Sequence, residues 1–459
     1  MRKFLLKKIL TMNLVLRVTY LFIVLALSIQ TNFLFAQENQ EHQVFLIGDA
    51  GEPDRAPKNL EVLRQQLEAA DENSTLIFLG DNIYAHGLPD KNDPERQIHE
   101  EKLTRQLSIT QNFKGKTFVI PGNHDWAKGK KYGWQQIQNE EAFVTEYMND
   151  ESVFQPKSGE PGPVEIKLNN DLYLIILDLQ WFLQKSNKPI PENMTEQELA
   201  ASTLLDFGDL MKKHINHHVI VAAHHPLYSY GSHGGKYPIK EHIFPLTAVN
   251  KNLFIPLPVL GSIYPIFRST AGNIQDIPHP KYKALRIAIE SFLKQHPNAI
   301  YVAGHEHSLQ HIVNENVNYI VSGSGSKHTY VKHGKLAKYV TSQTGFAKVS
   351  YSSTGASNLE FWVTNEQNLE GRKTYEATLY QKKAVKEKII QFPKLIFKDS
   401  TVNTFASAQY AAGNGKRKWM GSNYREVWNQ PLDIEVFNFQ KEKGGLKIVQ
   451  REVGCKPIL

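Results

Sequence analysis

Five apolar, β-branched runs of this 459-residue chain end in the same way, and this repeated ending constrains the fold more than any other feature. Each run is followed by a glycine or another small residue and then by a carboxylate, an amide or an imidazole. The five endings are Ile47-Gly48-Asp49, Leu79-Gly80-Asp81, Pro121-Gly122-Asn123-His124-Asp125, Ala222-Ala223-His224-His225 and Ala303-Gly304-His305-Glu306-His307. Because ligands bind at the carboxyl ends of strands in open α/β sheets, we expect these endings to meet at one rim.

The rest of the pattern alternates short β-branched runs with helical periodicity, which is typical of layered α/β architecture. The sequence predicts strands at 44–47, 75–79, 117–120, 172–177, 218–222, 299–302 and 319–321. It predicts helices at 57–70, 96–112, 196–214 and 282–296. The first of these helices has Pro57 in its first turn, and the third opens with the capping box Thr195-x-x-Glu198.

The residue types at the five endings favour a particular group of metals. Carboxylate, amide and imidazole together suit iron, zinc or manganese better than calcium, which prefers oxygen alone. A single Gly-Asp pair usually marks a turn, so the prediction depends on the ordered set of five. The single cysteine, Cys455, excludes a cysteine-rich zinc site and a disulfide framework.

In these five blocks the chain resembles the calcineurin-like metallophosphoesterase superfamily and, within it, the purple acid phosphatases. The family blocks read GDxG, GDxxY, GNH(D/E), a strand ending in His, and GHxH. The corresponding residues are Gly48-Asp49-Ala50-Gly51, Gly80-Asp81-Asn82-Ile83-Tyr84, Gly122-Asn123-His124-Asp125, Val219-Ile220-Val221-Ala222-Ala223-His224 and Gly304-His305-Glu306-His307. The resemblance covers roughly residues 42–365. We therefore expect an α/β fold in which two facing mixed β-sheets are flanked by helices.

The resemblance implies seven ligands, drawn from all five blocks, that hold two metal ions. They are Asp49, Tyr84 and His307 for an iron(III)-type ion, Asn123, His224 and His305 for a divalent ion of iron, zinc or manganese, and Asp81 as the bridge between the two. A tyrosine phenol is a group that a Lewis acid of Fe(III) strength can deprotonate, which gives a phenolate ligand. Two such metals lower the pKa of bound water to give hydroxide and neutralise the phosphoryl oxygens, so no side-chain nucleophile is needed.

The leaving group still needs a proton, and the candidate donors are His124, His225 and His233. Resemblance to the mammalian-type purple acid phosphatases implies His233, nine positions after the strand-end ligand His224. It also implies that His124 contacts phosphate, so Asn123, His124 and His233 are the expected substrate-binding residues. His225 is expected to face away from the metals because adjacent strand residues point to opposite faces.

The predicted function is hydrolysis of small phosphomonoesters by a dinuclear metallophosphatase, and two alternatives stay open. The first is a phosphodiesterase of the same superfamily, which gains support if Tyr84 points away from the metals. The second is a binding or assembly module whose phosphatase domain is vestigial. This last alternative is motivated by the basic C-terminal region, residues 366–459, through which a partner could bind.

The first 36 residues predict export. They hold Arg2, Lys3, Lys7, Lys8 and Arg17 and no acid, followed by an apolar stretch at 18–29 and by Leu34-Phe35-Ala36. This arrangement is typical of a secretory signal cleaved after Ala36, and the apolar stretch is short for a membrane span. We therefore expect a secreted or periplasmic protein without a membrane span. Much of the net charge of +7 lies in this leader, so no nucleic-acid partner is expected.

Three further segments complete the predicted organisation. Residues 37–365 are expected to form the catalytic domain, and residues 366–459 a small basic, β-rich appendage. Residues 235–281 are rich in proline, so we expect an irregular insertion without helices or strands. Its apolar residues are expected to cover the core, in preference to forming a lid or touching a membrane.

Overall fold

The computed structural model describes residues 41–381 except 249, 251 and 366–367, together with four strands nearer the C-terminus: β14 (Leu395–Lys398), β15 (Thr404–Ser407), β16 (Asp433–Glu442) and β17 (Gly445–Cys455). The predicted signal peptide, residues 1–36, lies outside the described residues. Within the described part of the chain, no helix combines the length and the apolar character needed to cross a bilayer.

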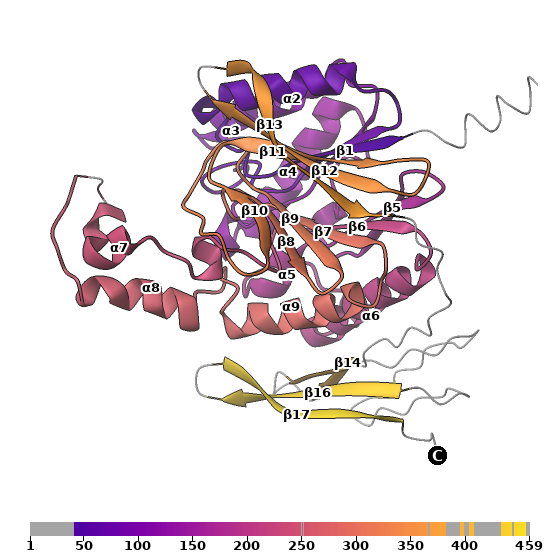
Figure 1. The fold of residues 1–459 in the computed structure, drawn as a ribbon, viewed down its shortest axis with the longest axis vertical. Coiled ribbons are helices and arrows are strands. Elements are labelled where there is room, and N and C mark those ends of the chain that lie inside the picture. The colour runs from indigo at the N-terminus through magenta and orange to yellow at the C-terminus, as the bar shows by residue number, and fades with distance from the viewer. Residues whose placement is uncertain are drawn as a thin grey trace, which may run out of the picture.

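Two mixed β-sheets lie face to face at the centre of the fold (Figure 1). The first has the strand order β13–β12–β11–β1–β2–β3 and the second β10–β8–β9–β7–β6–β5–β4. The bounds of the first sheet are β1 His42–Ile47, β2 Ser74–Phe78, β3 Lys116–Val119, β11 Gly345–Tyr351, β12 Ser357–Asn365 and β13 Asn368–Tyr380. Those of the second are β4 Val164–Lys167, β5 Leu172–Ile176, β6 His218–Ala222, β7 Ala299–Ala303, β8 Leu309–Asn314, β9 Val317–Ser322 and β10 Ala337–Thr341.

Two apolar layers hold the sheets and helices together. Val44 and Leu46 of β1 belong to the core between the sheets, where they share a cluster with Ile220 of β6. Phe45 and Ile47 point the other way and belong to the cluster that includes the buried leucines of the helices. Because successive strand residues alternate between faces, a continuous apolar run such as β1 requires cover on both sides. The predicted arrangement of facing sheets with outer helices is confirmed.

Helices form the outer layers (Figure 1). Their bounds are α2 Pro57–Ala69, α3 Arg96–Leu107, α4 Gly133–Met148, α5 Leu179–Leu183, α6 Glu196–Lys213, α7 Ile239–Ile243, α8 Leu260–Thr270 and α9 Pro280–Leu293. Short 3₁₀ turns are η1 Pro53–Arg55, η2 Ser108–Thr110, η3 Ala127–Gly129, η4 Lys157–Gly159, η5 Ser232–Gly234 and η6 Pro245–Ala248. Helix α2 packs on the first sheet and α9 on β7 of the second. The capping box at Thr195 and Glu198 forms as predicted.

The segment 235–281 differs from the prediction in two ways. It contains α7, η6 and α8. Helix α8 forms despite the prolines because Pro256 and Pro258 precede its first turn and only Pro265 lies within it. The apolar residues around α8 also fail to cover the core, with Leu260 63% and Ile263 60% exposed, whereas Ile277 near the end of the segment is buried.

The first sheet extends beyond the expected end of the catalytic domain. Strand β13 pairs antiparallel with β12 along its length, so the expected boundary at residue 366 falls inside the β12–β13 hairpin. Among the described residues after β13, β14 pairs with β15 and β16 with β17. The described residues of this region form strands, whereas a β-rich appendage and a partner that binds there stay predictions.

Candidate metal centre

The five strand endings meet at one rim, where the carboxyl ends of both sheets come together. Asp49 follows β1, Asp81 follows β2, Asn123 follows β3, His224 follows β6, and His305 and His307 follow β7. The loop after Asp81 adds Tyr84. The structure brings all seven of these side chains together, as the hydrogen bonds and distances below show.

Three of the seven residues have a left-handed backbone conformation, with φ of 59° at Asp49, 54° at Asp81 and 66° at His305. Residues with a β-carbon adopt this conformation rarely, and each instance costs on the order of 1–3 kcal/mol. Such strained residues concentrate at functional sites, where the surrounding structure holds them in place. Among the described residues, three of the eight non-glycine residues with positive φ are thus candidate ligands at this rim.

The glycines before the candidate ligands allow the strand ends to approach closely. A β-carbon at Gly122 would lie 2.4 Å from Oδ1 of Asp81, and one at Gly304 would lie 2.7 Å from Oδ2 of Asp49. Either contact is too short for real atoms, so these positions need glycine for space. These two glycines thus have a physical reason beyond the turns that they form.

One group of donors centres on the side chain of Asn123. Its Oδ1 lies 3.1 Å from Nε2 of His224 and 2.8 Å from Nδ1 of His305, and these two ring nitrogens are 3.2 Å apart. The second nitrogen of each ring faces a backbone carbonyl: Nδ1 of His224 lies 2.7 Å from Leu79, and Nε2 of His305 lies 3.0 Å from Gln275. This outer hydrogen bond fixes the neutral tautomer of a metal-binding histidine and turns its lone pair inward.

The arrangement of these lone pairs fits a bound cation. In the neutral tautomers, the inner nitrogens of His224 and His305 carry no proton, and neither does Oδ1 of Asn123. The carboxylate of Asp81 joins them, with Oδ1 at 3.3 Å from Nε2 of His224. Four hydrogen-bond acceptors that converge with no N–H or O–H group between them repel one another unless a cation lies between them. Nitrogen and oxygen donors in this number suit a transition-metal ion.

A second group of donors centres on Asp49. Its Oδ1 accepts a hydrogen bond of 2.8 Å from the hydroxyl of Tyr84 and lies 3.3 Å from Nε2 of His307. The Tyr84 hydroxyl is also 3.1 Å from the same nitrogen of His307, so the tyrosine points into the cluster. Burial, followed by the charge of Asp49, raises the pKa of Tyr84 well above its usual value. Only a strong Lewis acid would therefore convert this phenol into a phenolate ligand.

Asp81 lies between the two groups. Asp49, Asp81 and His224 each offer one ligand atom, and the three atoms lie within 4.8 Å of one another. Asp81 also accepts a hydrogen bond of 2.8 Å from the backbone N–H of His124. A carboxylate in this position can reach an ion in either group.

The two histidines proposed to contact substrate lie at the edge of the cluster. His124 directs Nδ1 to the carbonyl of Ala85 at 2.8 Å, and its Nε2 lies 3.9 Å from Oδ2 of Asp81. Burial is the main cause that lowers the pKa of His124 to about 4, so the ring is neutral near pH 7. His233 is held at Nδ1 by Asp276 at 3.0 Å, and its ring centre lies 4.0 Å from that of His305.

Glu306, between two candidate ligands in the sequence, holds the loop that carries His233. Its carboxylate accepts hydrogen bonds from the backbone N–H of His233 at 2.9 Å and of Ser232 at 3.2 Å, and from the Ser229 hydroxyl at 2.8 Å. Bonds to an ionised acceptor are among the stronger ones in proteins. The sequence analysis missed this role because Glu306 stands at the variable position of its block.

The insertion also contributes to the centre, which the sequence did not predict. The carbonyl of Gln275 orients His305, and Asp276 orients His233 while it pairs with Arg268 of α8. Both residues lie near the end of a segment that was expected to be irregular, far from every motif. The side chain of Gln275 additionally accepts a hydrogen bond of 2.7 Å from His225.

His225 lies beside the candidate ligand His305 and is not among the converging donors, so its orientation away from the metals stays a prediction. Its ring centre lies 4.5 Å from that of His305, and the side chain is fully buried. Strand β6 ends at Ala222, so the alternation of strand faces no longer applies at His225. Burial lowers its pKa to about 3, and the neutral ring supports Gln275 behind the centre.

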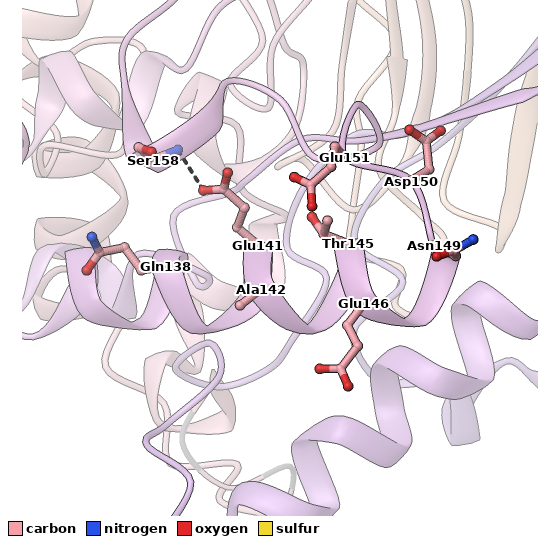
Figure 2. Close-up of a pocket in the computed structure, with 9 residues that line it drawn as sticks. All are labelled: Gln138, Glu141, Ala142, Thr145, Glu146, Asn149, Asp150, Glu151 and Ser158. Carbon is pink, nitrogen blue, oxygen red and sulfur yellow. Dashed lines mark hydrogen bonds between the residues drawn. The ribbon is translucent and has the colours of Figure 1, made fainter.

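A separate pocket lies along α4, away from the cluster (Figure 2). It has a volume of about 630 Å³, and its lining includes Glu141, Glu146, Asp150 and Glu151. Carboxylates at this density repel a phosphate group. The donor cluster at the rim is therefore the better candidate for the site of chemistry.

Two facing mixed sheets with this donor cluster at their carboxyl ends define the class of metal-dependent phosphoesterases. The family model described as calcineurin-like phosphoesterase matches residues 42–309, and the chain belongs to this family. The fold of this family generally binds two metal ions and indicates hydrolysis of phosphoesters. No curated protein matches the chain.

Several solved structures are similar to this chain at low sequence identity. One is that of "GAP50 the anchor in the inner membrane complex of Plasmodium", with 15% identity, a TM-score of 0.48, and coverage of 75% of this chain and 90% of that one. Purple acid phosphatase PPD1 from yellow lupin (Lupinus luteus) seeds has 15% identity, a TM-score of 0.44, and coverage of 74% and 54%. PhoD has 9% identity, a TM-score of 0.46, and coverage of 76% and 72%.

Proposed function

We propose that the chain is a dinuclear metallophosphatase that hydrolyses phosphomonoesters, with an iron(III)-type ion and a divalent ion of iron, zinc or manganese. The observation that carries the proposal is the convergence of two groups of donors on Asp81. Asp49, Tyr84 and His307 would hold the first ion, and Asn123, His224 and His305 the second. When bound, two such ions supply the activation of water and neutralise charge on the phosphoryl oxygens.

The residues around the two groups bind and orient the substrate. His124 presents Nε2 toward the cluster; because its Nδ1 donates to the carbonyl of Ala85, Nε2 of the neutral ring accepts a hydrogen bond from a protonated phosphate oxygen or a bound water. Lys327 adds a positive charge at the same edge, since its Nζ lies 3.1 Å from the ring centre of Tyr84. Asp276 accepts the Nδ1 proton of His233, which leaves Nε2 free to carry the proton that passes to the oxygen of the leaving group.

A phosphodiesterase acts on a phosphate that carries two ester groups, whereas the proposed phosphomonoesterase acts on a phosphate that carries one. A monoester dianion gains more than a diester monoanion from the charge of Lys327. We therefore expect higher kcat/KM for an aryl phosphate than for the corresponding bis-aryl phosphate. The measurement is initial-rate kinetics on both esters across a range of pH. Faster hydrolysis of the bis-aryl ester at every pH would overturn the monoester preference while leaving a metal-dependent hydrolase.

The iron(III)-type ion predicts a visible spectrum. Protein purified in air is expected to show a charge-transfer band from tyrosinate to iron, and Tyr84→Phe is expected to remove the band because, among the residues that the structure describes, no other tyrosine hydroxyl contacts the candidate ligands. The exposed Tyr132 provides the matched control, Tyr132→Phe, which should retain the band. A colourless, active enzyme that contains only manganese or zinc would contradict the iron assignment.

Export and the C-terminal region remain parts of the proposal. The basic and apolar leader supports secretion or a periplasmic location.

The assembly-module alternative would gain support if metal-replete protein hydrolysed no phosphate ester and yet retained a partner through residues 366–459. The complete set of donors at the rim supports the enzymatic proposal instead.

A further inference from the structure

Helix α8 exposes an apolar stripe to solvent. Leu260, Ile263, Tyr264 and Phe267 follow one another at the spacing of a single helix face, and they are 63%, 60%, 55% and 49% exposed. A stripe with this spacing normally packs against the core of its own domain. Here it packs against nothing among the described residues that would bury it.

The opposite face of α8 fixes the direction of this stripe. A β-carbon at Gly261 would lie 2.4 Å from the carbonyl oxygen of His242, and Pro265 is buried. Helices α7 and α8 thus pack on each other, and together they stand out from the body of the protein (Figure 1). The stripe cannot turn inward without loss of this packing.

The segment before α8 enlarges the exposed surface. We call the combined surface the apolar tip, and its members are Leu253, Phe254, Ile255, Val259, Leu260, Ile263, Tyr264, Ile266 and Phe267, each at least 40% exposed. Apolar residues gathered in this number on one projection mark an interaction site. Their arrangement on a projecting helix pair makes the surface convex.

The charge around the apolar tip is positive. Among the described residues between 236 and 267 the chain holds the exposed Lys236 and Lys240, and Glu241 is the single acid. The Nζ of Lys240 lies 4.7 Å from the ring centre of Phe254, so this positive charge sits directly beside the tip. A surface of opposite charge would be attracted to this edge.

We propose that the apolar tip inserts into the interface of a lipid bilayer that contains anionic lipids. A convex apolar projection enters a deformable bilayer readily, whereas a protein partner would need a matching concave surface. Aromatic and aliphatic side chains beside lysines are the composition of interfacial membrane-binding helices. The 11 residues of α8 extend about 16 Å, which is too short to span the hydrocarbon core of about 30 Å and suits a helix that lies in the interface.

Membrane binding would also position the candidate metal centre. Arg268, in the last turn of α8, pairs with Asp276, which in turn holds His233 at the rim. The helix that carries the apolar tip is therefore bonded to the loop beside the donor cluster. Insertion of the tip would keep this rim close to the lipid surface.

Vesicle flotation with the full chain tests the proposal. The probes are vesicles of phosphatidylcholine with 30% phosphatidylglycerol and vesicles of phosphatidylcholine alone. We expect the double variant Ile263→Ser and Phe267→Ser to reduce binding to the anionic vesicles by about tenfold or more, since each side chain loses its transfer into the apolar phase. Because the leader is the same in both proteins, the difference reports the tip alone.

The control is a double substitution of exposed apolar residues elsewhere, Ile98→Ser and Tyr147→Ser, which are 56% and 42% exposed and should leave binding unchanged. Equal turnover of an aryl phosphate by all three proteins shows that they are folded. Vesicle binding that the tip substitutions do not reduce would overturn the proposal, as would equal binding to both lipid mixtures. A dimer seen by light scattering and abolished by the same substitutions would instead assign the tip to a second copy of the chain.

Discussion

Replacement of Asp81 by asparagine is expected to lower kcat/KM for an aryl phosphate by about 10³-fold or more and to leave fewer than two metal ions per chain. Asp81 lies beside Asp49 of one donor group and His224 of the other, so its loss is expected to weaken both ions at once. Changes to residues that merely support a metal ligand already cost about 10- to 100-fold. A shared ligand should therefore cost considerably more.

Asparagine is chosen because it separates loss of charge from loss of fold. It has the shape of aspartate and tolerates the left-handed backbone at this position, where φ is 54°. Its side-chain oxygen can still accept the hydrogen bond from the backbone N–H of His124. We expect the melting temperature of the metal-free protein to change little, while turnover and metal content fall together.

Metal analysis and steady-state kinetics on the same preparation check this prediction. The control is Asp54→Asn, at a side chain that is 76% exposed and paired only with Arg105. If Asp81→Asn kept two ions and full turnover, Asp81 would not bridge the ions and the proposed centre would be wrong. Loss of turnover with both ions retained would also contradict the bridging role.

The sequence predicted the central strands and their endings well because both signals are local. All seven predicted strands exist, with ends that shift by at most two residues, and all four predicted helices exist as well. A buried parallel strand must be apolar on both faces, so a run such as β6 stands out from its neighbours. The glycines before the candidate ligands are required by the close approach of the strand ends, as Gly122 and Gly304 show.

The strands that the sequence missed have mixed polarity. Strand β13 includes Lys373, Thr374 and Glu376, because it lies at the edge of the first sheet and one of its faces meets solvent. Helix α4 lacks a capping side chain at Tyr132, so its start carries no local signal. Such elements are recognised through their pairing and packing, which a local pattern does not contain.

The residues that support the centre were missed for a related reason. Glu306, Gln275 and Asp276 act through hydrogen bonds to the His233 loop or to His305, across long distances in the sequence. Nothing in the immediate neighbourhood of these residues signals such a contact. The motifs located the seven candidate ligands, whereas only the three-dimensional structure locates the groups that orient the histidines.

Substitution of His233 by alanine is expected to separate good leaving groups from poor ones. An alkoxide is strongly basic and needs a proton as it leaves, whereas a nitrophenolate leaves without one. Loss of a general acid typically costs about 10²–10⁴-fold. We therefore expect His233→Ala to lower turnover of an alkyl phosphate by about 10²-fold or more, and turnover of a nitrophenyl phosphate by less than about tenfold.

The matched variant Asp276→Asn tests how His233 is oriented. It keeps the imidazole and the shape of its partner but removes the carboxylate that accepts the Nδ1 proton. The same selectivity between leaving groups should appear, with a smaller loss on the alkyl ester, because the ring can still adopt the correct orientation for part of the time. His333→Ala, at an exposed histidine, serves as the control and should affect neither ester.

An equal loss on both esters would rule out His233 as the acid, and metal content then identifies the reason. The His233 ring lies against that of His305, so its removal could weaken the divalent ion instead of the proton transfer. Loss of the ion would lower turnover of both esters and would be seen directly by metal analysis. Retention of both ions with an equal loss would leave phosphate binding as the role of His233, which should raise KM for both esters alike.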